Sequence, residues 1–270
     1  MIPKIIHYSW FSGEEMPEAF VQMMDTWKRV LPDYELKLWD ADALKEANLT
    51  FANEAYSERK WAFAADVIRV YAVYHYGGIW LDGDVAVYKS FDPFLNNRMF
   101  IGRESFIECQ TDNNFMNVNL LTSHCFGAEA KHPFLKDCLD YYKDRHFITS
   151  LNKDLPQGLR FDMRLLPSIQ ARLATKYGYT GNVLEEETIK VLEEDIHVYP
   201  SYFFDSPKYH DESESYCVHF KYGAWYPSKD RIHSSANSQY KRKKDAFYYL
   251  FTWMNKILAR KGLQIKVFSV

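Results

Sequence analysis

The segment Gly77–Asp84, which reads GGIWLDGD, constrains the fold more than any other stretch of the 270-residue chain. Two glycines end the helix predicted just upstream, because glycine adopts the backbone angles of a helix C-terminus at little steric cost. The three apolar residues that follow suit a short strand in the buried interior of a parallel sheet. Asp82 and Asp84 stand where that strand emerges. Ligands of open α/β sheets bind at this carboxyl edge of the strands, so the segment predicts a site there.

The remainder of the first hundred residues alternates strand and helix patterns, with strands predicted at 3–10 and 31–40 and helices at 13–29 and 57–76. Two further helices are predicted in the middle of the chain, at 132–144 and 168–178. The pattern is clearest in the second helix, where apolar side chains recur at the i, i+3, i+4 and i+7 positions Val67, Val70, Tyr71 and Tyr74. Such alternation favours an α/β fold with a mostly parallel sheet.

The chain is predicted to form one domain with an appended tail. No repeat or low-complexity linker interrupts residues 1–237, whereas residues 238–270 read as a basic, aromatic, helix-prone appendage. Residues 241–266 hold eight basic side chains and a single acidic one. An amphipathic helix of this kind either lies on an anionic membrane surface or packs on the domain with its basic face in water.

Composition argues against several classes of protein. A net charge of −3 does not suit a surface devoted to nucleic acid. The four cysteines form no Cys-x-x-Cys pair, so neither a zinc ribbon nor a disulfide scaffold is indicated. No window approaches the ~18 uninterrupted apolar residues of a spanning helix, and the N-terminus lacks the pattern of a signal peptide. We therefore expect a cytoplasmic protein, peripheral at the inner face of the plasma membrane if its tail binds lipid.

The spacing of Asp82 and Asp84 suits a hard divalent cation. Residues two apart in an extended chain face the same side, and Gly83 lets a ligand approach the backbone. A turn in which the aspartates only cap exposed backbone groups is the alternative. The upstream helix adds Asp66 and Arg69, three apart and hence on one face of a nearly all-apolar segment. Charges in such a segment are paired or functional, so an internal ion pair stays open beside a binding role.

Three motifs together resemble bacterial sugar transferases of glycosyltransferase family 32, in their order and spacing. They read IPKIIHYSWFSG, WAFAADVIRVYAVYHYGGIWLDGDV and VHFKYGAW. The first two are also similar to the donor-binding core of the large clostridial glucosylating toxins. The resemblance implies a GT-A-type, Rossmann-like fold, with a mixed, mostly parallel sheet flanked by helices. It also implies an enzyme of capsular-polysaccharide or lipopolysaccharide synthesis that uses Mn²⁺ or Mg²⁺.

The resemblance implies a role for each matched residue. Trp10 would stack on the nucleotide base, while Asp66 and Arg69 would hold the hexose hydroxyls and the ribose or phosphate side of the donor. Asp82 would touch ribose and sugar, and Asp84 would ligate the metal that bridges the diphosphate. Arg69, Asp82 and Asp84 are therefore the predicted catalytic residues.

The third motif departs from the family pattern His-His-x-x-x-Ser-Trp. His219 and Trp225 match it, but Phe220 replaces the second histidine and Ala224 replaces the serine. The resemblance implies that His219 contacts the metal or diphosphate and that Trp225 donates its indole N–H to a phosphate. A histidine that serves only its strand is the alternative for His219. His7, on the first strand, is interpreted as structural.

These features and the resemblance together predict a metal-dependent hexosyltransferase, and the resemblance implies that the anomeric configuration is retained. The first interpretation is transfer of galactose from UDP-galactose to a glycan acceptor carried on a polyprenyl diphosphate. The second is a GDP-mannose-dependent mannosyltransferase, because fungal members of the family use that donor. A D-x-D phosphatase and a non-catalytic sugar-binding scaffold are the alternatives from other classes.

Overall fold

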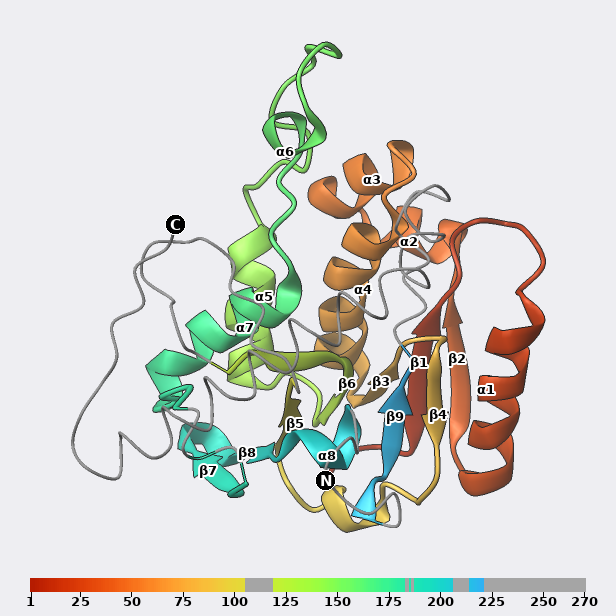
Figure 1. The fold of residues 1–270 in the computed structure, drawn as a ribbon, viewed down its shortest axis with the longest axis vertical. Coiled ribbons are helices and arrows are strands. Elements are labelled where there is room, and N and C mark those ends of the chain that lie inside the picture. Colours follow the sequence, from red (N-terminus) through yellow and green to blue (C-terminus); the bar gives the residue numbers. More distant parts are fainter. Residues whose placement is uncertain (105–118, 183–184, 186, 206–213, 221–270) are drawn as a thin grey trace, which may run out of the picture. The chain divides into compact units, whose positions relative to one another are not determined.

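The computed structural model describes residues 1–104, 119–182, 185, 187–205 and 214–220. A seven-stranded sheet has the order β2-β1-β3-β6-β5-β8-β7, and a two-stranded sheet pairs β4 with β9 (Figure 1). The strands are β1 (Ile5–Ser9), β2 (Glu35–Trp39), β3 (Gly78–Leu81), β4 (Val85–Val87), β5 (Met99–Arg103), β6 (Leu121–Ala128), β7 (Lys190–Leu192), β8 (Ile196–Tyr199) and β9 (Cys217–His219). The helices are α1 (Glu18–Val30), α2 (Ala41–Ala47), α3 (Thr50–Ser57), α4 (Trp61–Tyr76), α5 (Pro133–Tyr142), α6 (Gln157–Arg160), α7 (Leu166–Ala174) and α8 (Ser201–Phe204).

The larger sheet is mixed, and most of its strands share one direction. β1 pairs in parallel with β2 and with β3, and β5 pairs in parallel with β8. β6 runs antiparallel between β3 and β5, and β7 runs antiparallel beside β8. The predicted α/β fold, with a mixed, mostly parallel sheet flanked by helices, is confirmed, and its assignment to the GT-A type stays an expectation from the resemblance.

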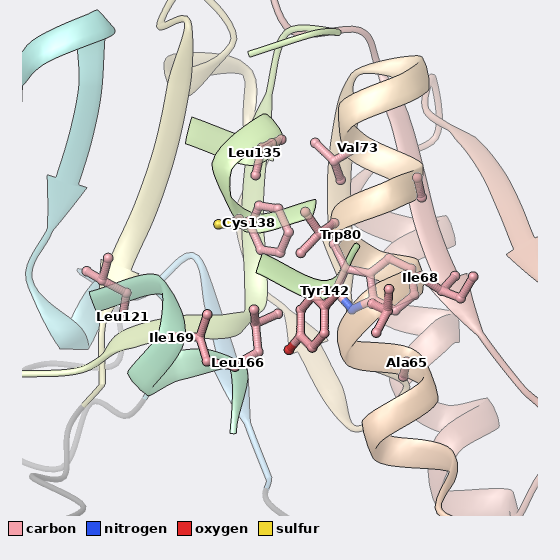
Figure 2. Packing of buried hydrophobic residues seen from close by; sticks show 14 of the residues in the cluster. Ala65, Ile68, Val73, Trp80, Leu121, Leu135, Cys138, Tyr142, Leu166 and Ile169 are labelled. Atoms are coloured by element: carbon pink, nitrogen blue, oxygen red, sulfur yellow. The ribbon is translucent and has the colours of Figure 1, made fainter. Parts of the chain in front are cut away.

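Strand β3 separates two hydrophobic cores, because successive side chains of a strand point to opposite faces. Trp80 lies in the larger core, where Figure 2 shows it with Ile68 of α4 and Tyr142 of α5. Ile79 and Leu81 lie in the smaller core with side chains of α1 and α8. All four residues of β3 are buried. The apolar run before the aspartates is therefore covered on both faces, as the sequence predicts.

Some element boundaries differ from those predicted. The helix expected from residue 13 begins at Glu18, directly after Pro17, which stands at its N-cap. The helix expected over 57–76 begins only at Trp61, and the separate helix α3 precedes it. Arg59 lies between them with φ +57°, a left-handed conformation that breaks a helix. The tail 238–270, its boundary with residues 1–237, and Trp225 lie outside the described residues, so these predictions stay untested.

The Gly77–Gly78 pair is required where α4 meets β3. Both residues have left-handed backbone angles, φ +67° and φ +104°. A Cβ atom on Gly78 would lie 2.7 Å from the carbonyl oxygen of Ile5 and 3.1 Å from His7 Nε2. His7 Nε2 donates to the Gly77 carbonyl (2.8 Å), and Trp39 Nε1 donates to His7 Nδ1 (3.2 Å). His7 thus ties β1 and β2 to the end of α4, which fits its predicted structural role.

Stability is expected to fall between pH 6.5 and pH 4 because of His7. Burial, opposed by the hydrogen bond to Gly77 and aided by the charge of Lys37, lowers the pKa of His7 from 6.5 to about 4. The unfolded chain therefore takes up the proton first as the pH falls, which destabilises the fold by about 3 kcal/mol in total. Urea unfolding of wild type and His7→Gln across this range measures the contribution. A wild-type curve that parallels the variant's at every pH would contradict the assignment.

None of the helices in the described ranges combines the length and the apolar character needed to cross a membrane.

Candidate active site

The D-x-D segment forms a tight turn between β3 and β4. The Asp82 N–H donates to the His124 carbonyl (3.0 Å), which extends the β3–β6 ladder by one residue, and the Val85 N–H donates back to the Asp82 carbonyl (3.1 Å). A Cβ on Gly83 would lie 2.7 Å from the ring of Phe20 on α1. Gly83 is therefore required by the packing of α1, and Phe20 takes the space that the sequence suggested for a ligand.

Arg69 joins the carboxylates of α4 and the D-x-D turn. Its guanidinium lies 3.2 Å from Asp66 Oδ1 through Nη2 and 3.2 Å from Asp82 Oδ2 through Nη1, and Nη1 also donates to the Ser123 carbonyl (2.7 Å). The residue is 4% exposed. Burial lowers the pKa of Arg69, but the charges of Asp82 and Asp66 outweigh it and raise this pKa above its ordinary value. Arg69 is thus a fixed buried cation at the site.

Asp66 and Asp82 are both held by further donors. The Leu166 N–H donates to Asp66 Oδ2 (3.3 Å), and Trp80 Nε1 donates to Asp82 Oδ1 (2.7 Å). Burial raises the pKa of Asp66 to about 6, against the opposing charge of Arg69. The internal ion pair that the sequence left open is present. Because both Asp66 oxygens are engaged within the protein, its contact with hexose hydroxyls stays a prediction.

His219 reaches the D-x-D turn through the small sheet. β9 runs antiparallel to β4 with His219 opposite Val85, and the Phe220 N–H donates to the Asp84 carbonyl (3.0 Å) (Figure 1). His219 Nε2 lies 3.2 Å from Asp84 Oδ1. The ligand atoms of Asp82, Asp84 and His219 all lie within 4.8 Å of one another. The structure therefore brings together the three residues that the sequence and the resemblance singled out for metal and donor.

This donor set fits a divalent cation. Carboxylate oxygens suit both Mg²⁺ and Mn²⁺, and an imidazole nitrogen favours the transition metal. Burial lowers the pKa of His219, but the hydrogen bond to Asp84 and the charges of Asp84, Asp82 and Asp205 raise it above its ordinary value overall. A cation bound here would take over the neutralising role of that proton.

Trp10 lies beside the same turn. Its indole N–H donates to the Glu14 carbonyl (2.6 Å), and its ring packs edge-on against Phe20 with centroids 5.6 Å apart. The Phe20 ring in turn contacts Gly83. Trp10 is half-buried, so part of its surface stays open to a ligand. Its stacking on a nucleotide base remains a prediction.

Two residues of this region were not predicted from the sequence. His124 of β6 stacks on His219, with ring centroids 4.1 Å apart, and Asp205 follows α8. Both side chains are buried, and His124 Nε2 lies 3.9 Å from Asp205 Oδ1. The sequence offers one signal for His124: it is a histidine in a segment, 121–128, whose other residues are apolar or small.

Comparison with known families identifies the region that holds the turn. Residues 17–101 match a glycosyltransferase sugar-binding region containing a DXD motif. This range includes Asp66, Arg69, Asp82 and Asp84. The match confirms the predicted enzyme class, a glycosyltransferase, for the part of the chain that it covers.

Similar curated proteins are fungal. Inositol phosphoceramide mannosyltransferase 3 of Schizosaccharomyces pombe is 34% identical over 138 residues, which are 50% of this chain and 35% of that protein. Mannosyl phosphorylinositol ceramide synthase SUR1 of Saccharomyces cerevisiae is 26% identical over 147 residues, 53% of this chain and 35% of that protein. The chain thus spans little more than a third of these relatives. By their names they act in the transfer of mannose, and they give no support to a bacterial capsular enzyme in particular.

A solved structure titled PaToxG Glycosyltransferase is also similar, at 17% identity, with 65% of this chain and 69% of that chain covered. Its TM-score of 0.43 is too low to support a conclusion about this chain.

Proposed function

We propose that this chain transfers a mannosyl residue from GDP-mannose to a lipid-linked acceptor. The convergence of Asp82, Asp84 and His219 beside the buried Arg69 carries the reaction class. The names of the fungal relatives favour mannose over the galactose that the sequence analysis placed first. They also favour a lipid acceptor, with an inositol phosphoceramide type replacing the polyprenyl diphosphate as the first candidate.

In this proposal, the residues of the site would bind the cation and keep the carboxylate of Asp82 in a fixed orientation. Asp84 and His219, with Asp82, would hold the cation, which supplies charge neutralisation for the departing nucleoside diphosphate. Arg69 and Trp80 each donate to one oxygen of Asp82, so this carboxylate keeps its orientation when the donor binds. With Arg69 and the carboxylates fixed before the substrate arrives, little reorganisation opposes the reaction.

The remaining expectations follow from the resemblance and belong to the same proposal. We expect retention of the anomeric configuration through front-face displacement, in which the departing diphosphate helps to deprotonate the acceptor. Peripheral membrane contact through residues 241–266, at the cytoplasmic face, would place the enzyme beside a lipid acceptor.

A panel of nucleotide sugars tests the proposal. GDP-mannose, UDP-galactose and UDP-glucose are incubated with the protein and Mn²⁺, and the released nucleoside diphosphate is measured by chromatography. GDP release from GDP-mannose, abolished by chelation with EDTA and restored by Mn²⁺, is the expected result. UDP release alone would contradict mannose as the transferred sugar and would favour a UDP-linked hexose, with galactose the first interpretation from the sequence. Binding and turnover of none of the three would contradict the transferase itself.

A further inference from the structure

His219 belongs to two clusters of possible ligands at once. Its Nε2 faces the D-x-D turn, at 3.2 Å from Asp84 Oδ1. In a second group, ligand atoms of His124, Asp205 and His219 also lie within 4.8 Å of one another. His219 Nδ1 is buried and makes no hydrogen bond within the described part of the chain. The second cluster is therefore either another cation site or a support for His219.

The contacts of His124 decide between these two. His124 Nε2 lies 3.0 Å from the Phe204 carbonyl oxygen. A carbonyl oxygen can only accept, so this nitrogen carries a proton and has no lone pair to offer a metal. It is also the nitrogen 3.9 Å from Asp205 Oδ1. A second cation held through this nitrogen would have to displace an existing hydrogen bond, and this favours support of His219 over a second cation site.

We infer that Asp205 is a positioning residue for the metal ligand His219: its carboxylate accepts the Nδ1 proton when Nε2 binds the cation. The inference rests on the proposed metal-dependent function. A neutral imidazole that ligates a metal through one nitrogen carries its proton on the other, and a carboxylate that accepts this proton fixes the ring and makes it a better ligand.

The main chain holds Asp205 in register with His219. The His219 N–H donates to the Asp205 carbonyl (3.1 Å), and the Asp205 N–H donates to the Ser201 carbonyl (2.8 Å). Phe204, the residue before Asp205, is also tied to β9, because the Cys217 thiol donates to its carbonyl oxygen (3.3 Å). The carboxylate is fully buried, and ionised carboxylates are rarely buried without a functional or charged neighbour. The stacked ring of His124 covers His219 from β6, so the imidazole has little freedom to turn elsewhere.

Manganese affinity measured without any nucleotide tests the inference. Free Mn²⁺ is followed by electron paramagnetic resonance during titration of the full chain and its variants. Asp205→Asn keeps the size of the side chain and is expected to weaken Mn²⁺ binding about 10- to 100-fold. His219→Ala should weaken it at least as much, and the double variant should bind like His219→Ala alone, because Asp205 acts only through that ring. Asp162→Asn is the matched control, a carboxylate 11% exposed that pairs with Arg164, and should leave the affinity unchanged.

Two results would overturn the inference while leaving the proposed function intact. One is wild-type Mn²⁺ affinity in Asp205→Asn, and the other is a loss of affinity in the double variant that equals the product of the losses in the two single variants. Unchanged Mn²⁺ binding in His219→Ala would instead remove His219 from the metal site and weaken the proposed function. Should Asp205→Asn fail to fold, ¹⁵N-histidine NMR of the wild-type protein with Mg²⁺ gives the answer. The His219 proton is expected on Nδ1 after Mg²⁺ is added, and a proton that stays on Nε2 contradicts the inference.

Discussion

Replacing Asp84 with asparagine is expected to lower metal-dependent donor cleavage by about 10³-fold or more. The carboxylate lies next to His219 Nε2, in the group whose ligand atoms are within 4.8 Å of one another. Loss of one carboxylate ligand weakens the binding of the cation that would neutralise the leaving diphosphate, and such neutralisation lowers the barrier by several kcal/mol. Release of nucleoside diphosphate at saturating donor and increasing Mn²⁺ measures the effect.

The fold should survive this change. An asparagine in place of Asp84 keeps the size of the side chain, and the backbone carbonyl at this position would still accept from the Phe220 N–H. Thermal unfolding without metal is therefore expected to stay close to wild type. Asp42→Asn, at a carboxylate 87% exposed on α2, is the matched control and should retain full activity. Full Mn²⁺-stimulated turnover in Asp84→Asn would contradict the assignment of Asp84 as a ligand of the catalytic metal.

Replacing Arg69 with methionine is expected to destabilise the fold by about 3–5 kcal/mol, because it leaves the carboxylates of Asp66 and Asp82 near each other without their buried counter-charge. Guanidinium unfolding measures the loss. Arg164→Met is the control: its guanidinium is 45% exposed and pairs with Asp162, so less than about 1 kcal/mol is expected. Equal losses in the two variants would show that burial adds nothing to the Arg69 pairs.

The effect of Arg69→Met should depend on pH in a defined direction. The pKa of Asp66 is about 6 in the folded protein against 3.8 ordinarily, so the fold favours the protonated acid. Its ionisation costs stability as the pH rises through 6, and the cost grows when Arg69 is absent. The difference between variant and wild type should therefore narrow from pH 7 to pH 5. A difference that widens over this range would contradict the role of Asp66.

Sequence patterns predicted where Asp66, Arg69 and the D-x-D turn lie in the fold, because the determinants of their positions are local. The glycine pair, the buried strand and the two aspartates are contiguous, and the helical spacing of Asp66 and Arg69 places both on one face. The ion pair to Asp82 follows from the packing of α4 on β3. The choice between an ion pair and a binding role could not be made, since it depends on Trp80, Ser123 and the N-terminus of α7.

The rest of the site depends on pairings between distant segments. The resemblance singled out His219, but nothing local shows that β9 pairs with β4 and brings this histidine to Asp84. His124 and Asp205 were missed for the same reason, as each acts only through tertiary contacts with His219. Gly83 was interpreted as space for a ligand. The packing of Phe20 against it was not foreseen, because this contact joins α1 to a turn roughly 60 residues away.

The β4–β9 pairing also has a consequence for the order in which the protein folds. It joins segments separated by roughly 130 residues, whereas the contacts among β1, α4 and β3 are made within the first hundred residues. Closing so long a loop is entropically costly, so the contacts among β1, α4 and β3 can form well before β9 docks. During synthesis or refolding, His219 would thus reach the D-x-D turn only after the first hundred residues have folded, through a ladder of three residue pairs.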